Sequence, residues 1–434
     1  MPLLLADVLA NKVRLSDSLY GKITRMQNKH LKPLLKATCP ACGLLCDDIL
    51  LATENEHLKL VSPNNCAKSM DFFSQKLSQT SPQIAGKTAT LQQAVAHAAS
   101  LLKTSKNPLF AGLSTDVQGF RAVYHLTQKI NGNLRHINSQ STARNIAVLQ
   151  STGWQTTTLT EVKNRADVIV CIGTDVVSHN ARFFERFVWL EADKSDAMFT
   201  VAHARQIFYI GEQLNTNAGI APDDRQPTSI NCSNADLPEI LAVLRALIAG
   251  KTLKTQTIAG IAISELIAIA DTLKQAKYAV LAWVAKDLDF AHAELTIQSI
   301  TETVALLNNK DSRAAGLSLG GSDGDTSANN ANTWLSGYSL SNENNTHDAV
   351  VWVNSFSPEK LPEQTDKPLI VLGNANTKFA QIPDVFIPIA TPGLDCSGTL
   401  FRVDSAVVLP LKKVRESNLP TLNDVARQIE ALLS

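Results

Sequence analysis

The sequence predicts an α/β fold made of nested parallel-sheet domains, preceded by a small subdomain that contains a cluster of cysteines. Two observations support this prediction. Strand-like and helix-like segments alternate from about residue 83 onward, which is typical of parallel strands joined by crossover helices. In addition, four of the seven cysteines lie between positions 39 and 66. We therefore expect a cysteine-rich unit followed by sheets whose strands are buried on both faces.

The first strand and its two flanking helices lie near the start of the α/β region. Apolar residues recur at helical spacing in 90–103, an apolar run follows in 107–113, and a second helical pattern spans 121–132. Gly132 is suited to cap the end of that second helix. The segment 112–119 is then the loop that leads from the strand into the helix.

A second unit follows the same order. A strand rich in β-branched residues at 166–173 leads into a loop at 173–180 and a helical segment at 181–190. Five further apolar runs predict buried strands. These runs span 198–204, 278–284, 348–356, 368–374 and 384–390.

The last third of the chain adds one polar segment and one helix. Residues 320–345 are rich in Gly, Ser and Asn, and we expect a long ordered or lid-like loop there. The chain closes with a predicted helix at 421–433, capped by Thr421 with Asp424 three residues later. Ligands of open parallel sheets bind beyond the carboxyl ends of the strands, so we expect four loops to line one cleft. The alternative is that these loops are ordinary polar connections. These loops are 112–119, 173–180, 320–338 and 373–378.

The pattern divides the chain into segments of different character. The predicted segments are an amphipathic N-terminal extension (1–37), a cysteine-cluster subdomain (38–82), a discontinuous α/β domain (83–145 and 256–400), an inserted α/β domain (146–255) and a C-terminal segment with its helix (401–434). We expect the extension to pack on this chain or on a partner.

The composition excludes several classes of partner. Lys plus Arg and Asp plus Glu both number 40, so there is no basic field to attract nucleic acid or an anionic membrane. Charged residues make up 18% of the chain, against about 25% in typical proteins, which favours a chain that is buried within an assembly. No apolar run approaches the ~20 residues of a membrane helix, and the first residues lack the pattern of a signal peptide. We therefore expect a cytoplasmic chain.

The cysteine cluster is the clearest candidate metal site. A C-x2-C-x3-C loop is followed by one more cysteine, and such a set can hold a [4Fe-4S] cluster because each thiolate binds a different iron. The alternatives are a zinc ion held by four thiolates and reduced structural thiols without a metal. The four candidate ligands are Cys39, Cys42, Cys46 and Cys66. The other three cysteines have no partner at ligand spacing.

Several motifs resemble one known family. In this order, the segments CPACGLLCDDI, NNCAKS, GLSTDVQGFRAVYHL, ADVIVCIGTDVVSHNARFFERF, GSDGDTSANNANTWLSGY and DVFIPIATPGLDCSGTLFRVD resemble the B subunits of formylmethanofuran dehydrogenases, which belong to the molybdopterin oxidoreductases. The resemblance runs from about Cys39 to the C-terminus and implies an iron–sulfur subdomain followed by nested α/β domains. In the archaeal enzymes it implies a [4Fe-4S] cluster and a tungsten or molybdenum bis-pterin centre that interconverts carbon dioxide and formate.

The chain departs from the family where that metal would be held. The family motif resembles S-x-x-C-E-A, and laid on Ser114 to Gly119 it puts Val117 at the cysteine position and Gln118 at the acidic position. A valine has no lone pair to donate to a metal. Two more loops depart as well, with Asn180 and Ala181 in place of a proline context and Cys396 with Ser397 before a G-T pair. We therefore predict that the Mo/W-pterin is absent and that Val117 leaves no catalytic residue.

The remaining candidate residues are those of a remnant cofactor cleft. Each has an alternative structural role. The loop 114–116 would cap the following helix. Lys68 would lie on the surface, and His179 and Arg182 would make structural hydrogen bonds. These candidates are Ser114, Thr115, Asp116, Lys68, His179 and Arg182.

The resemblance implies three functions in order of preference. The first is a non-redox, largely structural B subunit of a formyltransferase/hydrolase complex, which moves a formyl group from formyl-tetrahydromethanopterin to a methanofuran-like carrier and releases formate; its partners would be the A, C and D subunits. The second is an active Mo/W-pterin oxidoreductase that uses Asp116 as the metal ligand. The third is a stand-alone pterin- or nucleotide-binding module.

Overall fold

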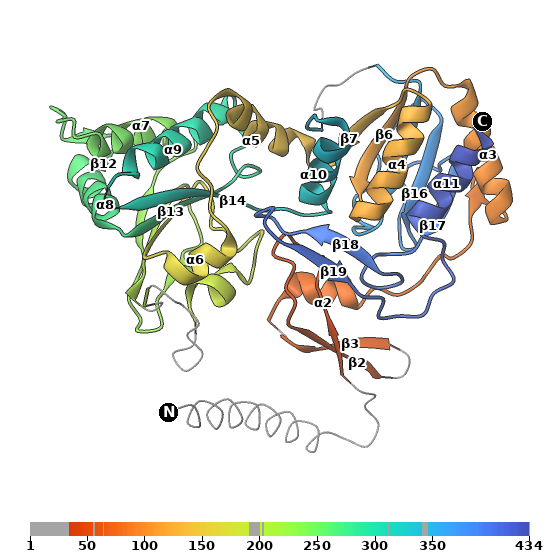
Figure 1. Ribbon diagram of the computed structural model, residues 1–434, viewed down its shortest axis with the longest axis horizontal. Coiled ribbons are helices and arrows are strands. Elements are labelled where there is room, and N and C mark those ends of the chain that lie inside the picture. The colour runs from red at the N-terminus through yellow and green to blue at the C-terminus, as the bar shows by residue number, and fades with distance from the viewer. Residues whose placement is uncertain are drawn as a thin grey trace, which may run out of the picture.

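The structure is a computed structural model that describes residues 34–54, 57–63, 65–190, 200–201, 204–310, 312–340 and 346–433. A small antiparallel sheet at the N-terminus is followed by two larger, mainly parallel sheets, which lie to the right and left of Figure 1 with the N-terminal unit below them. The predicted α/β class is therefore confirmed.

The N-terminal unit consists of three strands in the order β1-β2-β3 and one helix. Its elements are β1 (Leu35–Ala37), β2 (Ile49–Glu54), β3 (His57–Ser62) and α2 (Ala67–Phe73). The predicted extension 1–37 is wrong at its end, because residues 35–37 pair with β2 as a sheet strand. The rest of that extension, up to residue 33, lies outside the described residues.

The first large sheet has seven strands in the order β5-β4-β17-β16-β15-β6-β7. Its strands are β4 (Gln83–Ile84), β5 (Lys87–Thr88), β6 (Pro108–Ser114), β7 (Asn133–His136), β15 (Ala349–Asn354), β16 (Leu369–Asn374) and β17 (Val385–Ile389). The strands from β17 to β7 run parallel. One face packs against four helices in a shared apolar core. These helices are α3 (Leu91–Thr104), α4 (Val117–Lys129), α10 (Asp325–Ser336) and α11 (Leu422–Leu432).

The second large sheet has five parallel strands in the order β10-β9-β8-β13-β14. Its strands are β8 (Val168–Ile172), β9 (Gln206–Gly211), β10 (Thr228–Asn231), β13 (Tyr278–Val284) and β14 (Arg313–Leu319). The helices of this part are α5 (Ser139–Ser151), α6 (Leu159–Arg165), α7 (Leu237–Ile248), α8 (Ile263–Gln275) and α9 (Ala293–Leu307).

The predicted boundary of the inserted domain at residue 255 is wrong. Strand β13 pairs directly with β8, and β14 pairs with β13, so the segment up to Leu319 belongs to the five-stranded sheet. The inserted domain therefore extends well beyond 146–255, and the seven-stranded sheet takes up the chain again only at β15. The sequence pattern predicted β13 as a strand and missed β14, and it did not show which sheet β13 joins.

The predicted long loop at 320–345 contains a helix. Helix α10 spans Asp325–Ser336 and ends at Gly337, which has a positive φ of 82°. Its buried residues are Ser327, Ala328, Ala331 and Asn332. Because this buried face is made of small and polar residues rather than of large apolar ones, the helical period was hidden in the sequence.

The remaining elements are short. They are a π-helix η1 (Phe184–Val188), a 3-10 helix η4 (Asn217–Gly219), and the strand pairs β11 (Thr257–Ile258) with β12 (Ile261–Ala262) and β18 (Gly398–Phe401) with β19 (Val408–Leu411). The helix predicted at 181–190 is thus reduced to η1, and the strand predicted at 198–204 lies largely outside the described residues. The predicted capping box at Thr421 and Asp424 is confirmed at the start of α11.

Within the described part of the chain, no helix is both long enough and apolar enough to span a bilayer.

Candidate functional site

A cavity of about 620 Å³ lies between the two large sheets and the N-terminal unit. Its walls come from α2, from the start of α5 and from the segment 318–330, which joins β14 to α10. The close approach of that segment depends on Gly321, where an added Cβ would lie 3.1 Å from Val403 and 3.3 Å from Gly43. The Gly321 carbonyl accepts a hydrogen bond from the Gly43 amide at 2.8 Å. The cysteine loop is therefore held directly against the cavity wall.

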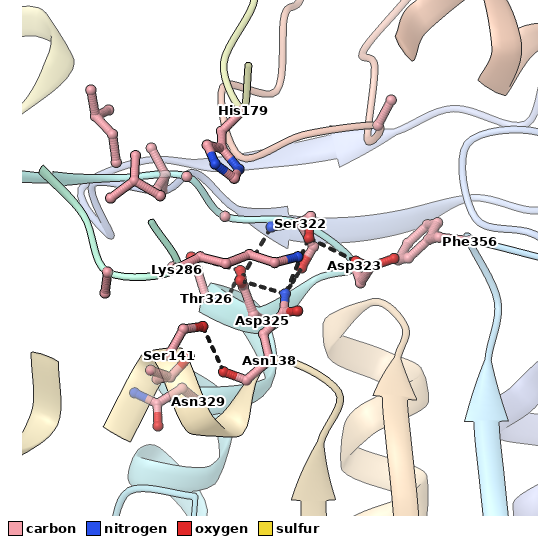
Figure 2. A pocket seen from close by; sticks show the side chains of 18 of the residues that line it. Asn138, Ser141, His179, Lys286, Ser322, Asp323, Asp325, Thr326, Asn329 and Phe356 are labelled. Carbon is pink, nitrogen blue, oxygen red and sulfur yellow. Dashed lines mark hydrogen bonds between the residues drawn. The ribbon is translucent and has the colours of Figure 1, made fainter. Parts of the chain in front are cut away.

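The starts of α5 and α10 meet at one side of this cavity. The Asn138 side-chain amide donates to the Asp325 carboxylate at 3.0 Å and to the Ser322 hydroxyl at 3.1 Å. Figure 2 shows this group of side chains, with Lys286 extending toward it across the cavity. The lining is thus polar at this end, with hydroxyls, an amide, a carboxylate and a lysine ammonium facing the same space.

A buried ion pair lies behind that polar wall. Asp323, which is 4% exposed, forms an ion pair with Lys360 and accepts a hydrogen bond from the Ser322 hydroxyl at 2.7 Å. Burial alone would raise the pKa of Asp323, but the Lys360 ammonium and the neighbouring hydroxyls of Ser322 and Ser357 hold it below its usual value. Asp323 therefore stays ionised and fixes the position of the loop.

The opposite wall contains two of the predicted site residues. The His179 ring Nε2 lies 2.6 Å from Asp287 Oδ1, and the Lys68 ammonium donates to the His179 carbonyl oxygen at 2.8 Å. Next to them, the Asn180 side chain exchanges two hydrogen bonds of 2.7 Å with the backbone of Gly320. Asn180, which replaces the proline context of the family, therefore clamps the two loops of the cleft to each other.

Ser114, Thr115 and Asp116 do not line the cavity. They lie at the end of β6 and the start of α4 and are at most 6% exposed. An added Cβ at Gly324 would lie 2.2 Å from the Thr115 carbonyl oxygen, which shows how closely the next loop covers them. Of the four loops that we expected to line one cleft, 173–180 and 320–338 do so, whereas 112–119 and 373–378 do not.

The Asp116 carboxylate acts as the N-cap of α4. It accepts hydrogen bonds from the Gly119 amide at 3.0 Å and the Gln118 amide at 3.3 Å, and a third from the Thr399 amide at 3.2 Å. Burial raises the pKa of Asp116 despite these donors. The structural alternative for this loop, the capping of the following helix, is therefore what the geometry shows.

The four clustered cysteines line a second, smaller cavity together with Lys68, Ser69 and Arg182. All four thiols are buried and none forms a disulfide. Burial raises the pKa of Cys42 to about 11, and it also raises the pKa of Cys39 and of Cys46. Lys68 lines both this cavity and the larger one, so it lies between the two.

The donor set around the cysteines fits an iron–sulfur cluster. The Ser69 hydroxyl is buried without a partner oxygen or nitrogen and faces the Cys39 thiol. Among the residues that the structure describes, no three His, Cys, Asp or Glu side chains converge closely enough to hold a single metal ion. Four thiolates are the ligand number that a [4Fe-4S] cluster takes, with each thiolate on a different iron, and also the number that a tetrahedral zinc ion takes.

Arg182 belongs to the cysteine site and not to the large cavity. Its guanidinium donates to both oxygens of Asp48 at 2.8 and 2.6 Å and also contacts Glu185. Arg186, which lies four residues further along the chain in η1, forms an ion pair with Asp47 at 2.7 Å. The prediction that Arg182 lines the remnant cofactor cleft is therefore wrong, because Asp48 and Glu185 hold its guanidinium at the cysteine cavity.

Sequence inspection missed three residues of the large cavity. Asn138 and Lys286 belong to no motif that we singled out. Asp323 lies in the segment GSDGDTSANNANTWLSGY, which resembles the family, but we interpreted that segment as part of a long loop and did not single out the residue. The clamp made by Asn180 was visible in the sequence only as a departure from the family pattern.

No protein-family model matches the sequence. Among curated relatives, the B subunit of the tungsten-containing formylmethanofuran dehydrogenase 2 of Methanococcus maripaludis is 23% identical over 428 residues, which covers 89% of this chain and 95% of the relative. The protein of the same name from Methanocaldococcus jannaschii is 22% identical over 426 residues, with coverages of 88% and 94%. The B subunit of the formyltransferase/hydrolase complex of Methylorubrum extorquens is 36% identical, but only over 90 residues, or 21% of this chain and 25% of the relative.

Two solved structures show the same fold. The crystal structure of the formyltransferase/hydrolase complex of Methylorubrum extorquens with methylofuran has a chain that superposes with a TM-score of 0.65 at 20% identity, covering 81% of this chain and 98% of that one. Acetylene hydratase of Pelobacter acetylenicus superposes with a TM-score of 0.60 at 10% identity, covering 92% of this chain and 69% of that one. The chain therefore shares its fold with these two proteins, and along 89% of the chain the comparisons confirm the similarity to formylmethanofuran dehydrogenase B subunits that the motifs predicted.

Proposed function

We propose that this chain is the B-type subunit of a formyltransferase/hydrolase complex. Such a complex would move a formyl group from formyl-tetrahydromethanopterin to a methanofuran-like carrier and release formate, and this subunit would carry out no redox reaction of its own. Similarity to B subunits of the archaeal dehydrogenases and of the bacterial complex supports membership of a hetero-oligomeric assembly. The A, C and D subunits of the complex would be its partners.

The observation that carries the non-redox role is the chemistry at position 117. Val117 is 6% exposed and forms the first turn of α4, at the position where the family motif has a cysteine ligand. An isopropyl group has no electron pair for a tungsten or molybdenum atom. The residues present at this loop therefore do not fit the bis-pterin metal centre, and we propose no step through it.

The alternative, an active dehydrogenase with Asp116 as the metal ligand, conflicts with the contacts of that carboxylate. A ligand oxygen would have to leave the amides of Gly119 and Thr399, which uncaps α4 and breaks the link to β18. Losing an N-cap costs about 1 kcal/mol. The loop at Gly324 also separates Thr115 from the large cavity. These contacts favour the structural role.

The cysteine site supports a [4Fe-4S] cluster as the resident group. Cys39, Cys42, Cys46 and Cys66 would be its ligands, and a hydroxyl hydrogen-bond donor and cationic side chains already surround them. When bound, such a cluster would supply metal–thiolate bonds that join the loop 39–46 to the start of α2 within the N-terminal unit. With no pterin metal beside it, we propose that its role is structural.

Co-purification and elemental analysis of the anaerobically purified complex test this proposal. We expect this chain to elute with three other subunits, to turn over no substrate alone, and to contain iron without molybdenum or tungsten. Viologen-dependent formate oxidation by the complex, abolished by Asp116→Ala, would instead establish the oxidoreductase. A stable, monomeric chain that binds a pterin or nucleotide would support the stand-alone module.

A further inference from the structure

A further cavity, of about 590 Å³, lies on the seven-stranded sheet, and it shares no described lining residue with the two cavities above. One face of this sheet packs against α3, α4, α10 and α11, whereas the apolar cluster on the other face contains no residue of a described helix. Buried parallel sheets are usually covered by helices on both faces. On this face the segment 363–367, which joins β15 to β16, forms one wall of the cavity instead.

The strand register sets the floor of this cavity. Arg135 on β7 pairs with Ala111 on β6, and Ala111 pairs with Trp352 on β15, so these three side chains form one row on the same face of the sheet. Leu109 and Val350 form the row before it. Ala111 is the smallest of the three side chains in its row. It therefore leaves a hollow between the side chains of Arg135 and Trp352, whose strands are about 9–10 Å apart.

The Arg135 guanidinium supplies a positive charge at the edge of this hollow. It lies 3.4 Å from Glu363, whose side chain is 83% exposed, against 20% for that of Arg135. An exposed pair of this kind contributes little stability, so the carboxylate of Glu363 can exchange with one from a ligand. Asp366 also lines the cavity. A doubly charged phosphate would be repelled by both carboxylates, whereas a single carboxylate fits the place that Glu363 now takes.

We propose that this cavity binds a small monocarboxylic acid with an aromatic or branched apolar body. The ligand carboxylate replaces Glu363 at the Arg135 guanidinium in a charge-assisted hydrogen bond. The body of the ligand lies on Ala111, against the indole of Trp352. An apolar lining with one well-placed polar group, in a volume of this size, is typical of small-molecule sites. This site does not depend on the proposed subunit role.

Calorimetric titration of the purified full-length protein, together with the subunits that co-elute with it, tests the proposal with phenylacetate. We expect phenylacetate to bind, and phenylacetamide, which has the same body without the charge, to bind about tenfold more weakly or less. Arg135→Gln should weaken the binding of phenylacetate by a similar factor. Arg245→Gln is the matched control, because Arg245 pairs with Glu302 beside the other large sheet and should leave the affinity unchanged.

Two further variants test the floor and the competing carboxylate. Ala111→Leu fills the hollow and should abolish binding. Glu363→Gln removes the competitor of the ligand and should tighten binding severalfold; because Glu363 is exposed, this variant keeps the test open if Ala111→Leu does not fold. The proposal would be overturned if neither phenylacetate nor isovalerate bound, if acid and amide bound equally well, or if Arg135→Gln and Glu363→Gln both left the affinity unchanged.

Discussion

The cysteine cavity and the 114–117 loop are the two places where the sequence motifs predict metal sites of the family, and the two differ in their residues and packing. The cysteine cavity retains four buried thiols, a neutral donor and cationic neighbours around one space. The 114–117 loop has an apolar side chain at the ligand position and is closed over by Gly324 and by the Thr399 amide. In one region, thiols and charged side chains surround a small cavity, whereas the other region is packed against its own chain.

On the proposed function, this difference is the way in which the fold lost one site and kept its shape. At the end of β6 the polar groups have been turned inward, since Asp116 caps α4 and Ser114 lies 3.4 Å from Asp323. Each of these contacts stabilises the closed loop. In the cysteine cavity, by contrast, the Ser69 hydroxyl has no oxygen or nitrogen partner, and burial raises the pKa of three of the thiols. On the proposed function, a bound cluster would stabilise this site by its metal–thiolate bonds.

The largest expected effect concerns the cysteine cavity itself. Cys42→Ser should remove almost all iron from the complex, because a serine hydroxyl is a poor ligand for the cluster. It should also loosen the N-terminal unit, and the hydrolysis of the formyl group by the complex should stay largely intact. Iron analysis, hydrogen exchange of residues 38–70 and a formate-release assay measure the three effects. Cys396→Ser is the control, since that half-exposed cysteine lies outside the cavity and should keep the iron. Complete loss of hydrolysis in an intact assembly would contradict a structural role.

The contact of Gly324 with the 114–117 loop, which we call the cover of that loop, should give the next largest effect when it is changed. Gly324→Ala puts a methyl group 2.2 Å from the Thr115 carbonyl oxygen at a φ of +71°, so the backbone must shift. We expect a loss of about 3 kcal/mol or more in stability. Gly337→Ala is matched, because Gly337 has a φ of +82° but open space around its Cβ position; it should cost only about 1 kcal/mol. Thermal unfolding of both variants measures the difference, and equal losses would show that the cover is not close-packed.

The buried ion pair that anchors this cover should have a smaller, pH-dependent effect. Asp323→Asn leaves the Lys360 ammonium unpaired beside a buried amide and should destabilise the protein by about 2–3 kcal/mol. Because the pKa of Asp323 is lowered in the folded protein, its stabilisation is present above the ordinary value of 3.8 and is lost as the pH falls through the folded value. The gap between wild type and variant should therefore shrink in acid.

An exposed pair of the same chemistry supplies the control for that variant. Asp366 pairs with Lys367 at 2.9 Å on the surface, and Asp366→Asn should change the unfolding temperature by no measurable amount. A difference between wild type and Asp323→Asn that stays constant from neutral to acid pH would show that the carboxylate charge is not what fixes the loop.

The sequence predicted the strands of both large sheets better than it predicted their assembly. Apolar runs located β6, β8, β13, β15, β16 and β17, because buried parallel strands are continuous apolar segments. Which strands pair is set by long-range contacts, and so the boundary at 255 was wrong. Helix α10 was missed because its buried face consists of small residues that fit close to β6 and β18, with no large apolar stripe.

The candidate site was predicted where the chemistry is local. Ligand spacing placed Cys39, Cys42 and Cys46 around one cavity, since three residues on a tight loop must stay close. Arg182 was assigned to the wrong cavity, because its direction depends on Asp48, which lies far away in the sequence. The role of Asn180 as a clamp could not be predicted, because it depends on the position of Gly320 in the folded chain.

The smallest expected effect is also the sharpest test of the comparison between the two regions. Val117→Cys restores the sulfur at the family ligand position, yet the side chain at this position is buried and the loop does not line the large cavity. We expect no bound molybdenum or tungsten, and a change in stability within about 1 kcal/mol, because valine and cysteine are similar in volume. Mass spectrometry of metals in the purified complex, with Val117→Ser as a control without a thiol, measures this directly. Stoichiometric molybdenum or tungsten in Val117→Cys would contradict this expectation, because the closed loop would then have opened for a pterin. In that case the missing sulfur, and not the packing around it, would be what separates this chain from a redox subunit.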